Sequence, residues 1–127
     1  MTIQTAFLWL AELLMVFALG CFLQAFRLRK IDLDRHRFWG KAGAYVVFAG
    51  LLAVELVTRV LVWEMPRRSD TAFSWHLITA SGALVLLVLL LITGLRRIRT
   101  IHIRLYLFFL PLFTAAVVLS FFAFRLW

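Results

Sequence analysis

Two histidines beside long apolar segments are the first candidates for chemistry in this chain. His36 stands in the segment DRHR and His102 in RTIHIR. Two neutral imidazoles on different helices of a bundle are the minimum protein ligation for a haem or a transition metal. We therefore expect His36 and His102 to be candidate haem or metal ligands. Because both stand among arginines, contact with lipid phosphate at a membrane interface is the alternative.

A second set of ionisable residues lies within the apolar segments, namely Glu12, Glu55, Arg59 and His76. Such residues are costly in lipid. Glu55 and Arg59 are four positions apart, so one helix face presents both and each can neutralise the other. The four residues share a predicted depth near the outer surface, where an inward-facing cluster could bind an ion, a proton or an anionic group. The alternatives are a structural Glu55–Arg59 ion pair and a His76 that caps the interface near Trp75.

The spacing along the helices keeps these two sets apart. At 1.5 Å per residue, a helix from His36 to the level of Glu55 spans roughly 28 Å. His76 shares the outer depth, so His36 and His76 cannot ligate one metal. Any two-histidine site must combine His36 with His102, which leaves His76 to a separate outer site.

Long apolar helices must position all of these groups. Of the 127 residues, 65% are hydrophobic and 16% are charged, which a water-soluble domain of this size could not bury. The apolar runs predict membrane spans at about 5–26, 40–63, 75–94 and 105–124. We expect an all-α integral membrane protein, with one transmembrane domain over residues 1–127 that forms an antiparallel four-helix bundle. The first span lacks a basic leader and cleavage site, so we expect it to be retained.

The basic residues predict the orientation, because positively charged loops resist translocation. Ten fall on the side expected to face the cytoplasm: Arg27, Arg29, Lys30, Arg35, Arg37, Lys41, Arg96, Arg97, Arg99 and Arg104. Three fall on the other side: Arg67, Arg68 and Arg125. Both termini are therefore expected outside, in a bacterial inner membrane, with the basic connections next to anionic lipid.

Other residue types agree with this topology. Tryptophan favours membrane interfaces. Four tryptophans fall at the predicted outer level and one at the inner level: Trp9, Trp63, Trp75 and Trp127, and then Trp39. Small residues that would let helices approach closely are Gly43, Gly50, Thr79, Ala83, Ala115 and Ala116. Pro111 is expected to kink the fourth span.

Several classes of function are disfavoured. The sequence has no Gly-rich phosphate loop, HExxH pair, CxxC pair or plausible nucleophile triad, so we expect no enzyme. The single cysteine, Cys21, is expected to be a buried, inert thiol. The net charge of +8 reflects arginines at the ends of the spans, so we expect lipid contact and no nucleic acid.

Polar motifs stand at fixed places along the spans: DRHR before the second span, SWH opening the third, LRRIR and IHIR before the fourth, and FFLPLF within the fourth. This order resembles the CtaM-like family of small four-helix bacterial membrane proteins. The resemblance runs from Arg35 to the end of the chain and rests on His36 with Arg37, His76, His102 and Pro111. Members of that family are implicated in the maturation of haem-copper respiratory oxidases. The resemblance implies a role near haem or copper handling and makes the three histidines the residues to test.

The sequence is consistent with three functions. The first is an accessory or assembly protein of a membrane redox complex, with histidines that bind or pass on haem or metal. The second is a structural subunit that packs Phe-rich spans against a larger respiratory or photosynthetic complex. The third is a small proton-coupled transporter that uses Glu12. The strong charge asymmetry counts against the third, because small multidrug transporters have few charged loops and little orientation bias.

Overall fold

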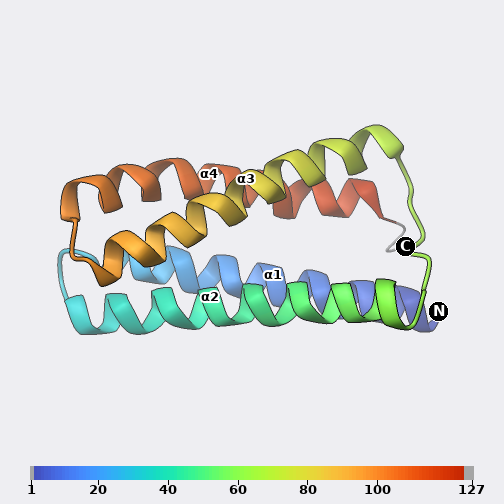
Figure 1. The fold of residues 1–127 in the computed structure, drawn as a ribbon, viewed down its shortest axis with the longest axis horizontal. Helices are drawn as coiled ribbons and strands as arrows, with labels where there is room; N and C mark the ends of the chain where they lie inside the picture. The colour runs from blue at the N-terminus through green and yellow to red at the C-terminus, as the bar shows by residue number, and fades with distance from the viewer. Residues whose placement is uncertain (1, 125–127) are drawn as a thin grey trace. The chain divides into compact units, whose positions relative to one another are not determined.

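The computed structural model describes residues 2–124 and contains four α-helices within them (Figure 1). They are α1 (Ile3–Leu28), α2 (Leu33–Glu55), α3 (Asp70–Leu95) and α4 (Arg99–Ala123), and a π-helical turn, η1 (Leu56–Val60), continues α2. All four helices, with η1 counted as part of the second, are long and apolar enough to cross a membrane. The chain is therefore an all-α, multi-pass membrane protein. The predicted outer residues Arg125 and Trp127 lie outside the described residues.

Each helix begins before its predicted apolar run, and the second and fourth end at Val60 and Ala123, short of the predicted ends at 63 and 124. The second begins at Leu33, ahead of the run predicted from residue 40, and the Asp32 side chain accepts a hydrogen bond of 3.1 Å from the Arg35 N–H. The third begins at Asp70, where the Ser69 hydroxyl accepts one of 3.2 Å from the Ala72 N–H. Aspartate and serine are favoured at this capping position because they satisfy an N–H that has no helical partner. Hydropathy therefore located the spans but not the helix starts.

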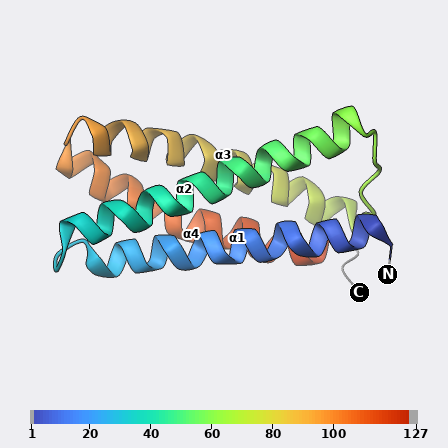
Figure 2. The ribbon, with the colours of Figure 1, turned by 90° about the horizontal axis from the view of Figure 1, so that it is seen from below.

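The chain folds as two compact units. One contains α1, α2 and η1, and the other, Ser69–Ala123, contains α3 and α4. Each is a hairpin of two antiparallel helices joined by a short turn, which Figures 1 and 2 show from two directions. The antiparallel order expected for consecutive helices holds within each hairpin. The bundle of four and the placement of both termini outside stay predictions.

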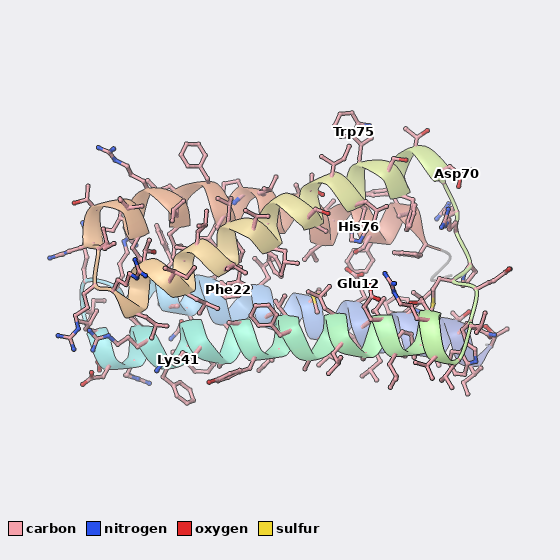
Figure 3. All side chains as sticks on the ribbon, in the orientation of Figure 1. Glu12, Phe22, Lys41, Asp70, Trp75 and His76 are labelled. Carbon is pink, nitrogen blue, oxygen red and sulfur yellow. The ribbon has the colours of Figure 1, made fainter. Side chains whose placement is uncertain are left out.

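Glycines let α2 approach α1. A Cβ at Gly43 would lie 2.8 Å from the Phe22 ring, and one at Gly50 would lie 2.5 Å from the end of the Met15 side chain. Phe22, labelled in Figure 3, is buried. Gly43 and Gly50 are both buried too. Side chains of α1 therefore pack directly onto these two glycines, and close approach of the two backbones stays a prediction.

Small residues also permit the packing of α3 on α4. A Cβ at Gly82 would lie 2.9 Å from Leu112 Cδ2, and Ala83 and Ala116 are buried. Pro111 lies inside α4, which continues through it. Next to it, the rings of Phe109 and Phe113 stack with their centroids 5.4 Å apart.

The turn after α3 uses an unusual residue. The Arg97 N–H donates to the Gly94 carbonyl and the Ile98 N–H to the Thr93 carbonyl, which is the Schellman pattern of a helix end. That pattern needs a residue with positive φ, and Arg97 has φ 56°. Glycine is the usual residue there because a Cβ is disfavoured in this conformation.

Candidate functional site

His36 joins the two helices of the first hairpin near their shared turn. The residue lies in the first turns of α2, and its Nδ1 is 2.6 Å from the Ala25 carbonyl oxygen of α1. Ala25 stands in the last turn of α1, where carbonyl groups lack the usual helical partner. A carbonyl oxygen only accepts, so Nδ1 carries the proton and donates it. In the neutral ring, the lone pair is then on Nε2.

His102 occupies the matching position in the second hairpin. It lies in the first turns of α4, and its Nδ1 is 3.1 Å from the Leu90 carbonyl oxygen and 3.1 Å from Thr93 Oγ1, both on α3. The Thr93 hydroxyl donates to the Leu89 and Leu90 carbonyls at 2.9 and 3.2 Å. The Nδ1 proton is thus shared between the Leu90 and Thr93 oxygens. The His102 ring again has its lone pair on Nε2.

Gly94 makes room for the His102 ring. A Cβ at Gly94 would lie 3.3 Å from His102 Cε1, closer than an ordinary van der Waals contact. Thr93 and Gly94 together therefore form a notch in the last turn of α3, with a polar oxygen on one side and no side chain on the other. The His102 ring seats in this notch.

His76 bridges the second hairpin toward its other end. Its Nδ1 lies 2.9 Å from the Ala116 carbonyl oxygen of α4. Figure 3 shows His76 pointing from α3 toward α4, while the neighbouring Trp75 points away and is 57% exposed. The two residues thus have different environments, and the expectation that His76 faces into the helix packing agrees with this contact.

All three histidines share one geometry, and it has two consequences. Each donates from Nδ1 to a backbone carbonyl of the other helix in its hairpin, so each connects two helices. Metal-ligating histidines commonly show the same arrangement, because a carbonyl partner fixes the tautomer and the ring orientation and leaves ligation to Nε2. The residues therefore fit the chemistry of an axial haem ligand.

The structure places the predicted pair in different hairpins. His36 belongs to the first and His102 to the second, each one or two helical turns past the basic turn of its hairpin. Ligation of one haem by both residues stays a prediction. Within residues 2–124, no group of three or more His, Cys, Asp or Glu side chains is placed to hold a metal ion.

The predicted outer cluster divides in the same way. Glu12 is buried in the first hairpin, and Arg59 and Glu55 form the ion pair that their spacing predicts. Both side chains of that pair are more than half exposed, 79% for Arg59 and 57% for Glu55. His76 belongs to the second hairpin. The ion pair itself is confirmed, whereas the four-residue cluster and its position inside a bundle stay predictions.

The sequence does not indicate the hydrogen-bond partners of the three histidines. A helix carbonyl leaves no mark in the sequence, so Ala25, Leu90 and Ala116 could not be named in advance. The one available signal is the pair Thr93–Gly94 at the end of an apolar run, where a hydroxyl stands next to a residue without a side chain.

Comparisons of the chain with protein-family models, curated proteins and solved structures find no match.

Proposed function

We propose that this protein is an accessory or assembly protein of a respiratory-type redox complex in the bacterial inner membrane, and that His36 and His102 are haem or metal ligands. The observation that carries the proposal is the Nδ1–carbonyl hydrogen bond of each histidine. It holds each ring in the tautomer that ligates through Nε2. The sequence resemblance to proteins implicated in oxidase maturation supports the same class of function.

The proposed orientation brings the two ligands to one side of the membrane. Each histidine lies just past a basic hairpin turn, the first around Arg29 and Lys30 and the second around Arg96 and Arg97. If both turns face the cytoplasm, as the excess of basic residues favours, His36 and His102 share the inner depth. The same basic residues would then contact anionic lipid.

Asparagine variants separate ligation from helix bridging. An Asn side chain carries an N–H at nearly the position of Nδ1 but has no imidazole lone pair, so it keeps the hydrogen bond and loses the ligand. We expect purified protein to show a haem absorption band that His36→Asn or His102→Asn removes. His76→Asn is the matched control and should keep the band. Colourless wild-type protein after incubation with haem would refute the ligand role.

The same hydrogen bonds favour a second candidate, a structural subunit that ligates nothing. Each histidine connects two helices of its hairpin, and this structural role alone explains its presence. This candidate predicts that the Asn variants behave like wild type, that the Ala variants lose only stability, and that no preparation is coloured. The protein would still co-purify with a large complex after mild solubilisation.

A further inference from the structure

The two hairpin turns share a short sequence motif. The segment LRKI, residues 28–31, begins at the last residue of α1, and LRRI, residues 95–98, begins at the last residue of α3. Residues 28–37 of the first turn and 95–104 of the second each hold four basic residues, so the two can be compared position by position. We call residues 95–104 the arginine turn, because its basic residues are all arginines: Arg96, Arg97, Arg99 and Arg104.

The first turn uses part of its positive charge within its own hairpin. It contains two acidic residues, and one of them, Asp34, has its Oδ1 atom 4.0 Å from Arg37 Nη1. Arg29 donates to the Phe26 carbonyl at 2.7 Å, and its guanidinium lies 3.6 Å from the centroid of the Phe26 ring. Two of the four basic side chains of this turn therefore have a partner in the first hairpin.

The arginine turn has no such partners. It contains no acidic residue, and the one acid of its hairpin, Asp70, begins α3 and so stands roughly 39 Å away at the far end of that 26-residue helix. Within residues 2–124, none of its four arginine side chains forms an ion pair or a hydrogen bond, and all four are exposed. The turn therefore presents four positive charges to an anionic partner outside the chain.

The backbone at Arg97 supports a role for its side chain. Arg97 has φ 56°, where glycine is the favoured residue because a Cβ is costly. Lys30, the matching residue of the first turn, has no positive φ. Because no hydrogen bond or ion pair of the Arg97 side chain offsets this cost within residues 2–124, the strain points to a contact with another molecule.

The chemistry of the turn suits a partner that carries both phosphate and hydrocarbon. A guanidinium binds phosphate through two parallel hydrogen bonds, a geometry that an ammonium group does not offer. Because α3 and α4 are long enough to cross a membrane, their turn lies at the level of the lipid headgroups. Exposed apolar side chains alternate with the arginines: Leu95, Ile98, Ile101 and Ile103. A soluble anion would leave these side chains uncovered, whereas a phospholipid also supplies acyl chains for them.

We infer that the arginine turn is a binding site for an anionic phospholipid that carries two phosphate groups in one headgroup. A phosphate diester has two charged oxygens, and one bidentate arginine occupies both of them. A headgroup with a second phosphate engages a second arginine in the same way, and the remaining two add favourable charge. This inference rests on the lipid contact proposed above and narrows it to one turn and one class of lipid.

Lipid titration of the full chain in detergent micelles, read by native mass spectrometry, tests the preference. The probes are cardiolipin, which has two phosphates, and phosphatidylglycerol, which has one. At equal phosphate concentration we expect cardiolipin to bind about tenfold more tightly, the effect of one further bidentate pair. Equal affinities overturn the inference. Displacement of cardiolipin by pyrophosphate at the same concentration would indicate a site for a soluble anion and would overturn it too.

Arginine-to-lysine variants keep the charge and remove the bidentate geometry. Arg96→Lys with Arg97→Lys should weaken cardiolipin binding about tenfold. Arg35→Lys with Arg37→Lys, in the first turn, is the matched control and should change it less than about twofold, because exposed charges there act without a defined headgroup geometry. No loss in the first double variant, or an equal loss in both, contradicts a site at the arginine turn.

Arg97→Gly separates loss of binding from loss of folding. Glycine relieves the positive φ, so this variant should be at least as stable as wild type while it binds cardiolipin about fivefold more weakly. Unchanged affinity would mean that the side chain does not contact the lipid. The haem band, recorded on the same preparations, reports on the histidines alone, so a failure of lipid selectivity can be told from a failure of haem binding.

Discussion

In the α3–α4 hairpin, polar side chains within the span donate to helix carbonyls, whereas the α1–α2 hairpin carries charged side chains at comparable positions along its helices. Thr79, Thr93, Thr114 and Ser120 each donate to a carbonyl of their own helix at 2.6–2.9 Å. The first hairpin also has such a hydroxyl, since Thr58 donates to the Val54 carbonyl at 2.7 Å, but in addition it holds the buried Glu12 and the exposed Glu55–Arg59 pair.

The difference follows from the donor and acceptor chemistry of the side chains. A hydroxyl or a neutral imidazole has a proton to give, and helix carbonyls can accept a second hydrogen bond. A carboxylate only accepts, and the N–H groups inside a helix are already in use, so an acid in its ionised form needs a cation or another donor. The four hydroxyls of the second hairpin therefore use carbonyls of their own helices, while in the first hairpin Glu55 is paired with Arg59.

The largest expected effect on stability is in the packing of the first hairpin. Gly43→Ala would place a Cβ 2.8 Å from the Phe22 ring, which is buried and rigid. We expect a loss of about 1–3 kcal/mol in the free energy of unfolding, measured in mixed detergent micelles. Gly82→Ala in the second hairpin meets only the flexible end of Leu112 and should cost less.

Gly20→Ala and Gly40→Ala are the controls for this comparison, because nothing lies within 4 Å of the added Cβ. The higher helix propensity of alanine should make them neutral or stabilising by up to about 1 kcal/mol. Equal effects at Gly43 and Gly20 would contradict the close approach of α2 to α1.

Removal of the hydrogen bond between His76 and Ala116, which connects α3 and α4, should have the next largest effect on stability. His76→Ala removes the donor to the Ala116 carbonyl and should cost about 1 kcal/mol of unfolding free energy. His76→Asn keeps a donor at nearly the same place and should recover most of that loss. Similar losses of stability in both variants would mean that the His76 ring stabilises the hairpin by packing and not by its hydrogen bond to the Ala116 carbonyl.

The two hairpin turns should respond in opposite directions to glycine. Arg97→Gly relieves a positive φ and should stabilise the second hairpin by about 0.5–1 kcal/mol. Arg29→Gly should destabilise the first, because Arg29 has φ −56° and its guanidinium donates to the Phe26 carbonyl at 2.7 Å. Thermal unfolding in detergent would show both shifts, and a destabilising Arg97→Gly would count against the helix-end geometry.

The smallest expected effect on stability is at the notch that holds His102. Gly94→Ala should displace the ring by a few tenths of an ångström and change stability by less than about 0.5 kcal/mol, since alanine favours the helix. The informative reading is the ¹⁵N chemical shift of the His102 ring, which should move while that of His76 stays fixed. An unchanged His102 signal would place the ring elsewhere.

The sequence predicted the four spans well because apolar runs of this length have one structural solution in lipid. The helix starts at Leu33 and Asp70 were missed because hydropathy ignores the capping residues Asp32 and Ser69, although both are recognisable by type. The π-helical turn at Leu56–Val60 has no comparable signal.

For the candidate site, the sequence predicted which residues take part but not which contacts they make between helices. The spacing of Glu55 and Arg59 predicted their ion pair, because residues four positions apart on one helix are neighbours on its surface. The bridges of His36, His76 and His102 depend on which carbonyl faces which ring, and that is decided by the crossing of two helices. The pattern of residues within a single helix does not indicate how that helix crosses its neighbour, so these hydrogen bonds could not be predicted.

Gentle purification of the protein from its native membrane, followed by an absorption spectrum and identification of what accompanies it, tests the proposed function most directly. We expect a respiratory-type redox complex in the preparation and a haem band that His36→Asn and His102→Asn diminish while His76→Asn does not. A preparation without any redox complex, in which all three Asn variants match wild type, would contradict it.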